Sequence, residues 1–264
     1  MQNRPDGDLG GDQDKVIMMI QHAVYMLVVN SLCLRFMLLV LFLAMFCASQ
    51  TWAQSEDPVT KKIVACVGDS NTQRGYPAIL EKQLGPDWRA VNCGIGAATV
   101  LDGTLRPFHK MPHYQEALES EADVVIIMLG TNDANPRWWD AERATDFKGP
   151  PQEEFKARYL ALIDALQETP KKPKVIVAIP LPVFPERARP ANRENTRGRR
   201  DNLVAKVIPI IKKVAEEKKL PVVDLQEVMA DTEEMATDGV HFSNAGYSKM
   251  TRALAEAVQA VTKK

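Results

Sequence analysis

The sequence predicts an α/β fold, namely a single three-layer α/β/α domain on a five-stranded parallel sheet. Two observations predict it. From residue 62 onward, short apolar runs alternate with longer amphipathic stretches. The chain has 264 residues, 45% of them hydrophobic, which suits one domain with a sizeable core. Strands that alternate with helices form parallel sheets covered on both faces, so we expect a flavodoxin-like arrangement.

Five short segments are the expected strands of this sheet. The third reads DVVIIML, apolar after its first residue, which is typical of a parallel strand buried on both faces. In chain order, the expected strands are Ile63–Val67, Trp88–Asn92, Asp123–Leu129, Val175–Ile179 and Pro221–Leu225.

Helical spacing of apolar residues predicts the elements between and after these strands. Pro209 should kink the third of the helices, and Ser243 is a candidate N-cap for the last. The expected helices are Tyr76–Leu84, Glu153–Gln167, Arg199–Lys218 and Ser243–Val261.

The N-terminal region is expected to be separate from the domain. Phe36–Ala48 is an uncharged apolar run that follows Arg35 and precedes Thr51-Trp52-Ala53, the order of a secretory signal peptide. The run is shorter than the roughly 20 apolar residues of a membrane span. We therefore expect residues 1–53 to be an extension and signal peptide, removed by cleavage near Ala53, and residues 54–264 to form a secreted or periplasmic domain without a stable membrane span. A retained N-terminal membrane anchor is the alternative.

Charge and cysteine content narrow the remaining possibilities. A net charge of −1 gives no indication of nucleic-acid binding. Cys66 and Cys93 each lie near the end of an expected strand and are interpreted as buried free thiols. A disulfide between them is the alternative, if their strands are neighbours.

Polar and glycine-rich segments follow the expected strands, at the edge where such sheets bind ligands. Gly68-Asp69-Ser70-Asn71-Thr72 follows the first strand, Asn92–Thr99 the second, and Gly130-Thr131-Asn132-Asp133 the third. Asp238-Gly239-Val240-His241-Phe242 precedes the last helix. Their side chains should meet at one edge of the sheet.

These residue types fit nucleophilic catalysis. A serine hydroxyl needs a base to accept its proton, and His241 is the histidine in a strand-end motif. Asp238, three residues earlier, can orient the imidazole and stabilise its protonated form. Donors for an oxyanion are the backbone N–H of Ser70 and the side-chain amide of Asn132. Taken alone, Ser70 would be interpreted as a helix cap and Asn132 as a turn residue.

The three motifs GDSNT, GTND and DGVH resemble, in order, the GDS, GxND and DxxH blocks of the SGNH (GDSL-like) hydrolases, over roughly residues 62–261. The resemblance implies the SGNH hydrolase fold, Ser70 as nucleophile and Asp238 and His241 as its supporting pair. It implies an oxyanion hole of Ser70, Asn132 and a glycine N–H from the loop after the second strand. That glycine position holds Ala97 here. We expect Ala97 to have a negative φ and its N–H to donate to the oxyanion, with Gly96 as the alternative donor.

No cofactor is implied by the resemblance, and no metal site is expected. His109 and His113 lie in a proline-flanked loop, but no third ligand stands at a suitable spacing. Trp138 and Trp139 belong to the segment Pro136-Arg137-Trp138-Trp139 that follows GTND, and they are expected at the rim of the site, the alternative being that they pack inward. The segment 186–200 is rich in arginine and is either a solvated loop and helix start or a docking face for an acidic polysaccharide.

The segment after GTND is similar to that of carbohydrate-directed O-acetylesterases, including sialate and xylan acetylesterases. The resemblance therefore implies an acetylesterase acting through an acyl-enzyme on a small-molecule or glycan ester, with no nucleic-acid partner. Two alternatives stay open. One is a lipase, thioesterase or lysophospholipase of the same fold, and the other is a non-catalytic carbohydrate-binding module.

Overall fold

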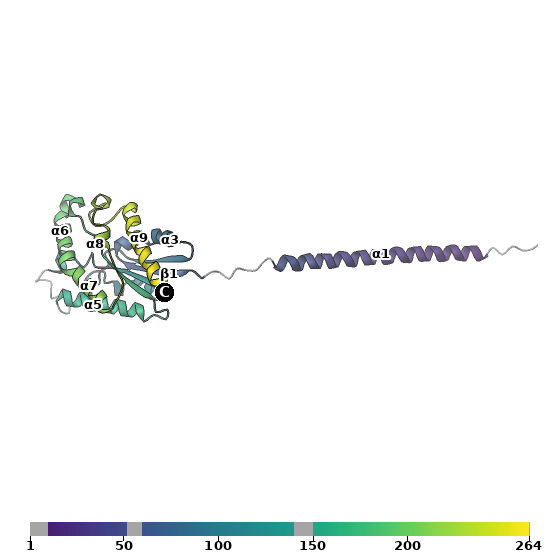
Figure 1. The fold of residues 1–264 in the computed structure, drawn as a ribbon, viewed down its shortest axis with the longest axis horizontal. Helices are drawn as coiled ribbons and strands as arrows, with labels where there is room; N and C mark the ends of the chain where they lie inside the picture. The colour runs from purple at the N-terminus through teal and green to yellow at the C-terminus, as the bar shows by residue number, and fades with distance from the viewer. Residues whose placement is uncertain (1–9, 52–59, 140–149, 264) are drawn as a thin grey trace, which may run out of the picture. The chain divides into compact units, whose positions relative to one another are not determined.

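The computed structural model describes residues 10–51, 60–139 and 150–263, and the chain divides into two units, Met1–Val59 and Thr60–Lys264 (Figure 1). The expected boundary between residues 53 and 54 lies outside the described residues and stays a prediction.

Helix α1 (Gly10–Thr51) belongs to the first unit. Its segment Lys15–Phe42, of 28 residues, is long and apolar enough to cross a membrane, judged by length and composition alone. A signal sequence near an N-terminus meets the same criterion. The predicted run Phe36–Ala48 is thus only part of a longer helix. The length of that run therefore gives no argument against a membrane span. The helix is compatible with a signal peptide and with an anchor.

The second unit contains the predicted parallel sheet. Its strands are β1 (Lys62–Gly68), β2 (Trp88–Gly94), β3 (Val124–Met128), β4 (Lys174–Ile179) and β5 (Val222–Asp224). They lie in the order β2-β1-β3-β4-β5, and every pair is parallel. This is the flavodoxin-like order, whose direction reverses between β1 and β3. The fold prediction is confirmed.

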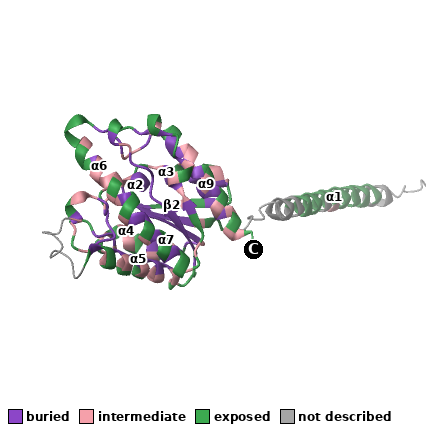
Figure 2. Ribbon diagram, turned by 60° about the vertical axis from the view of Figure 1, so that its left-hand side comes forward, coloured by how far each residue is buried: buried purple, intermediate pink, exposed green. Residues whose placement is uncertain are grey.

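Helices cover both faces of the sheet, as the layered prediction requires (Figure 2). One buried cluster joins the sheet to α4 (Pro112–Glu119), α5 (Pro151–Gln167) and α7 (Ile208–Glu217). The other joins it to α3 (Tyr76–Leu84), α8 (Leu225–Val228) and α9 (Asn244–Thr262). Successive strand residues alternate between the clusters: Ala65 and Val67 belong to the first, Val64 and Cys66 to the second. The Ser243 side chain caps α9 by accepting from the Gly246 N–H, as expected.

Short elements complete the unit. Helix α2 (Ser70–Gln73) follows β1 directly. The described 3₁₀ turns are η1 (Phe108–Lys110), η2 (Pro136–Trp138), η4 (Pro185–Arg187), η5 (Pro190–Asn192) and η7 (Glu233–Met235).

The helix predicted over Arg199–Lys218 differs in the structure. It begins earlier, as α6 (Arg193–Asn202), and passes through a π-helical turn, η6 (Leu203–Val207), into α7. Pro209 lies in the first turn of α7 and lacks the N–H that a continuous α-helix would use. The wider π turn accommodates the hydrogen bond that Pro209 cannot make. We had expected Pro209 to kink an α-helix instead. Turns of this kind are frequent at functional sites.

Cys66 and Cys93 are free and buried. Although β1 and β2 are neighbours, Cys66 is paired with Asn92 and Cys93 with Val67. This offset of one residue directs the two side chains to opposite faces of the sheet, into different clusters. Burial raises the pKa of both thiols to about 12, so they stay protonated and unreactive.

The end of β2 lies against the backbone of α2, and Gly94 permits this close approach. A Cβ on Gly94 would lie 2.4 Å from the Gln73 backbone nitrogen and 2.6 Å from the Thr72 Cβ. A glycine is required there so that the loop after β2 can reach the loop after β1.

We therefore predict that Gly94→Ala lowers the free energy of unfolding by about 1–3 kcal/mol, the usual cost of overpacking. Gly96→Ala is the matched control, because its Cβ would meet only the flexible end of the Gln73 side chain, at 2.9 Å. Urea titrations of both variants measure the difference. Equal stabilities of the two variants would contradict this account of the β2–α2 contact.

Candidate active site

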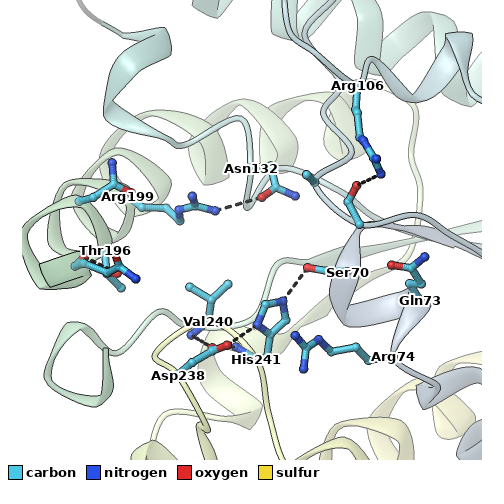
Figure 3. A pocket seen from close by; sticks show the side chains of 14 residues that line it. Ser70, Gln73, Arg74, Arg106, Asn132, Thr196, Arg199, Asp238, Val240 and His241 are labelled. Atoms are coloured by element: carbon cyan, nitrogen blue, oxygen red, sulfur yellow. Dashed lines mark hydrogen bonds and ion pairs between the residues drawn. The ribbon is translucent and has the colours of Figure 1, made fainter. Parts of the chain in front are cut away.

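The strand-end motifs converge on one cavity (Figure 3). Ser70 is the first residue of α2, directly after β1, and Asn132 follows β3. The loop that carries Asp238 and His241 precedes α9. The cavity has a volume of ≈ 670 Å³, and all of the predicted catalytic and oxyanion residues line it: Ser70, Gly96, Ala97, Asn132, Asp238 and His241.

Ser70, His241 and Asp238 form a continuous hydrogen-bonded series. Ser70 Oγ lies 2.8 Å from His241 Nε2, and His241 Nδ1 lies 2.7 Å from Asp238 Oδ2. The imidazole can thus accept the serine proton at Nε2 while it donates from Nδ1 to the carboxylate. The predicted spacing of three residues places aspartate and histidine side by side within one loop.

The loop around Asp238 is folded so that one carboxylate serves two purposes. Asp238 Oδ1 accepts the backbone N–H groups of Val240 and His241, at 3.1 and 2.9 Å. Burial opposes the charged form of Asp238, but the hydrogen bonds from the His241 side chain and from these backbone groups outweigh it and lower the pKa of Asp238. The carboxylate is therefore ionised beside the imidazole at neutral pH.

Gly239 makes this loop possible. Its φ is +88°, and a Cβ there would lie 2.6 Å from the Phe184 carbonyl oxygen. The Phe184 N–H donates to the Gly239 carbonyl at 2.8 Å, which holds the loop against the segment after β4. Both the backbone conformation and the close contact require glycine.

The buried residue Asn71 joins the first and last motifs. Its side-chain amide donates to the Val240 carbonyl at 3.3 Å, and its Oδ1 accepts the Tyr247 hydroxyl at 3.0 Å. Asp69 caps α2 by accepting the Asn71 N–H at 2.9 Å. These contacts fix the loop of Ser70 against the loop of His241.

Asn132 is held in one orientation from both sides. Its Nδ2 donates to the Ala98 carbonyl at 3.0 Å, and its Oδ1 accepts from Arg199 Nη1 at 3.0 Å. Since a guanidinium can only donate, the oxygen of the amide must face Arg199. The second N–H of Nδ2 stays available to the cavity.

Ala97 departs from the expected backbone conformation. Its φ is +62°, in the left-handed region, where we had expected a negative φ. The turn that positions it is closed by a bond from the Ala98 N–H to the Ile95 carbonyl at 3.2 Å. The glycine of the family block suits this conformation better, and an alanine there costs about 1–2 kcal/mol. Within the described chain, the Ala97 N–H makes no hydrogen bond, so it is a free donor at the cavity wall.

The structure does not bring Trp138 and Trp139 to the rim. Trp138 is 7% exposed, and its ring packs with the first cluster and beneath the Arg137 guanidinium. The Trp139 indole N–H donates to the Asp133 carbonyl at 2.7 Å. Neither residue lines the cavity. The alternative reading, that this segment packs its tryptophans inward, describes them correctly.

Asp133, the last residue of GTND, supports the neighbouring loop. Its Oδ1 accepts the N–H groups of Val100 and Leu101, both at 2.8 Å, while Oδ2 hydrogen-bonds to no other described group. Burial raises the pKa of Asp133 to about 7, against the lowering effect of these two bonds.

Eight further residues line the cavity, and our sequence analysis did not assign them to the site: Gln73, Arg74, Arg106, Asn192, Asn195, Thr196, Arg199 and Val240. Four of them are spaced by three, one and three residues, which is the spacing of one face of a helix. They are Asn192, Asn195, Thr196 and Arg199. This polar stripe in the segment 186–200 was the available signal.

Among the described residues, no group of three or more histidine, cysteine, aspartate or glutamate side chains is placed to hold a metal ion. His109 instead lies 3.3 Å from Asp102, which also accepts from Lys110 and Arg158. This cluster holds the loop before α4.

A parallel α/β/α domain whose strand ends assemble a serine, a histidine and an aspartate has the architecture of a serine hydrolase. The chain belongs to the GDSL-like lipase/acylhydrolase family, whose model matches residues 63–249. This places it in the class of carboxylic ester hydrolases, as the motifs predicted.

Individual relatives agree with the family. The chain is 30% identical over 226 residues to an acetylxylan esterase of Xylanibacter ruminicola, a match that covers 78% of this chain and 44% of that protein. The chain thus spans less than half the length of this curated relative. Similar solved structures include a carbohydrate acetylesterase of Sinorhizobium meliloti (20% identity, TM-score 0.57, 76% and 100% of the two chains) and the aryl esterase of M. smegmatis (23%, 0.57, 76% and 99%). At these identities the structural likeness concerns the fold.

We predict that Asp133→Asn changes the pH dependence of stability. The folded-state pKa of about 7 lies above the ordinary value of 3.8, so the folded protein binds a proton that the unfolded chain lacks between these pH values. Wild type should therefore gain stability relative to Asp133→Asn as the pH falls from 8 to 5, by on the order of 2 kcal/mol. Urea titrations at both pH values measure this, and parallel profiles would contradict it.

Proposed function

We propose that this chain is a serine esterase that hydrolyses ester bonds through an acyl-enzyme on Ser70. The observation that carries the proposal is the series of short contacts from Ser70 Oγ through His241 to Asp238, at 2.8 and 2.7 Å, on the wall of an open cavity. Family membership supports the reaction class.

In the proposed reaction, Ser70 Oγ attacks the ester carbonyl while His241 Nε2 accepts its proton. The bond to the alcohol then breaks, and His241 returns the proton to the leaving alcohol. A water molecule next gives a proton to His241 and attacks the acyl group, which releases the acid and restores the Ser70 hydroxyl. Asp238 stabilises the imidazolium that forms in each half of the reaction. These steps require no cofactor.

The proposed oxyanion hole has donors from three loops. They are the backbone N–H groups of Ser70 and Ala97 and the free N–H of Asn132 Nδ2. Both backbone groups lack a hydrogen-bond partner within the described chain. Gly96, which also lines the cavity, is the alternative to Ala97. Loss of one such donor typically costs about 3–4 kcal/mol of barrier.

We propose O-acetyl groups on carbohydrate as the substrate. The relative named acetylxylan esterase supports this choice, and so does the lining of the cavity. Arginine, asparagine, glutamine and threonine side chains predominate there, with Val240 as one of few apolar members. Such a surface suits sugar hydroxyls better than an acyl chain of many carbons.

We further propose that the N-terminal helix α1 directs the domain out of the cytoplasm, as a signal peptide cleaved near Ala53 or as a retained anchor. Its apolar segment Lys15–Phe42 supports export in both forms. N-terminal sequencing of the native protein distinguishes them, and a soluble cytoplasmic protein that keeps this helix would contradict the proposal.

Ser70→Ala should lower kcat/KM for p-nitrophenyl acetate by roughly 10⁴-fold or more, and His241→Ala should do nearly as much, because the two act as a unit. Asp238→Ala should lower kcat/KM by a smaller factor. Ser120→Ala and His109→Ala are matched controls, since neither residue lines the cavity. Thermal unfolding checks that each variant is folded. Undiminished turnover by a folded Ser70→Ala variant would refute the mechanism.

The enzyme should prefer acetate over longer acyl groups. In an apolar groove, each buried methylene would improve binding by about 0.8 kcal/mol, but the lining of this cavity is largely polar. We expect kcat/KM to fall along the p-nitrophenyl acetate, butyrate and octanoate series. Acetate release from acetylated glycans should be seen in parallel. A rise along the series would favour the lipase or thioesterase alternative.

A further inference from the structure

The cavity beside Ser70 has an excess of positive charge. Among the described residues, three arginines line it, namely Arg74, Arg106 and Arg199, against a single carboxylate, Asp238. That carboxylate is already occupied by His241 at 2.7 Å. Figure 3 shows the arginines on three different sides of the serine and histidine, and they come from segments far apart in the chain.

Helix α6 separates its arginines into two groups. Those that do not line the cavity have acidic partners: Arg193 and Arg197 lie 3.7 and 3.4 Å from Glu186, and Arg200 lies 2.9 Å from Asp201. Arg199, on the cavity face, forms no ion pair with any described carboxylate, and its guanidinium donates instead to the neutral Asn132 amide. Among the α6 arginines, the one that lines the cavity is therefore the one without an ion-pair partner in the described part of the chain.

The environment of Arg199 makes this lack of a partner significant. The side chain is half-buried, and burial lowers its pKa, an effect that Asp69 and Asp133 oppose from a distance. A cation removed from water is costly unless an anion compensates it. One donor is used by Asn132 Oδ1, and the remaining donors of the planar group are free for a ligand.

The other two arginines extend the positive surface at the mouth of the cavity. Arg106 donates to the Gly96 carbonyl at 3.1 Å, which places its charge beside the loop of Ala97. Arg74 is exposed and, within the described chain, has no ion-pair partner. Together they would attract an anion toward Arg199.

We propose that this site selects esters of carboxylate-bearing sugars and that Arg199 binds the sugar carboxylate while the ester lies at Ser70. The inference rests on the proposed function and names the substrate class of that site. A guanidinium and a carboxylate match as a planar two-pronged pair, so the contact would orient the sugar as well as attract it. Arg199 is a specificity residue in this scheme, and Arg74 and Arg106 assist.

Two substrates that differ only at the carboxylate test the proposal. Acetylated methyl glucuronoside carries the carboxylate, and acetylated methyl glucoside carries a hydroxymethyl group in its place. We expect wild type to favour the glucuronoside in kcat/KM by about tenfold or more, within the range that one charged hydrogen bond supplies. Equal kcat/KM values for the two esters would overturn the proposal.

Variants assign the preference to Arg199. Arg199→Gln should bring the ratio of the two kcat/KM values close to one, mainly through a higher KM for the glucuronoside. Because Arg199 also contacts Asn132, both substrates can lose kcat, and the ratio cancels this common loss. Arg197→Gln is the matched control on the same helix, paired with Glu186 and Glu194 outside the cavity, and should keep the wild-type ratio. An unchanged ratio in Arg199→Gln would overturn the assignment.

A binding measurement separates this inference from the proposed function. Calorimetry on Ser70→Ala compares methyl glucuronoside with methyl glucoside, and neither requires hydrolysis. If no ester is turned over, the proposed function fails, while tighter binding of the glucuronoside that Arg199→Gln removes still supports the carboxylate site. Equal binding of the two sugars would overturn the site whatever the enzyme hydrolyses.

Discussion

The candidate site depends on a contact between segments that lie about 170 residues apart. Asn71, a buried residue of the first motif, donates to the Val240 carbonyl and accepts from the Tyr247 hydroxyl. One amide therefore joins the end of β1, the loop of His241 and the start of α9. These bonds hold together the two loops in which Ser70 Oγ lies 2.8 Å from His241 Nε2.

Much of this arrangement could be predicted from the sequence because it follows local rules. Buried parallel strands require apolar runs, which identified β1, β3 and β4, and the regular alternation of strands with helices identified β2 and β5 to within a few residues. Parallel strands place all their carboxyl ends at one edge, and the order reverses between β1 and β3, the strands that precede Ser70 and Asn132. The sheet topology alone therefore predicts that the motifs lie close together.

Other features depend on long-range packing, which the sequence motifs do not describe. The positive φ of Ala97 belongs to a loop whose next residues are held by the carboxylate of Asp133, 32 and 33 residues further along the chain. The Trp139 indole turns inward because the Asp133 carbonyl accepts its N–H. Arg199 belongs to the polar stripe that begins at Asn192, but the sequence analysis treated it as one arginine among several. Its difference from Arg197 lies in the rotation of α6, which a charge count does not reveal.

The buried carboxylates and the cavity arginine are parts of one electrostatic arrangement. Asp69 and Asp133 both have their pKa values raised by burial, and the charge of Arg199 acts to lower that of Asp69. In return, both carboxylates favour the charged form of Arg199. These acids lie too deep to neutralise the guanidinium directly, so they keep it charged without occupying its donors. An arginine supported in this way stays available to an anion that enters the cavity, which a surface arginine paired with Glu186 does not.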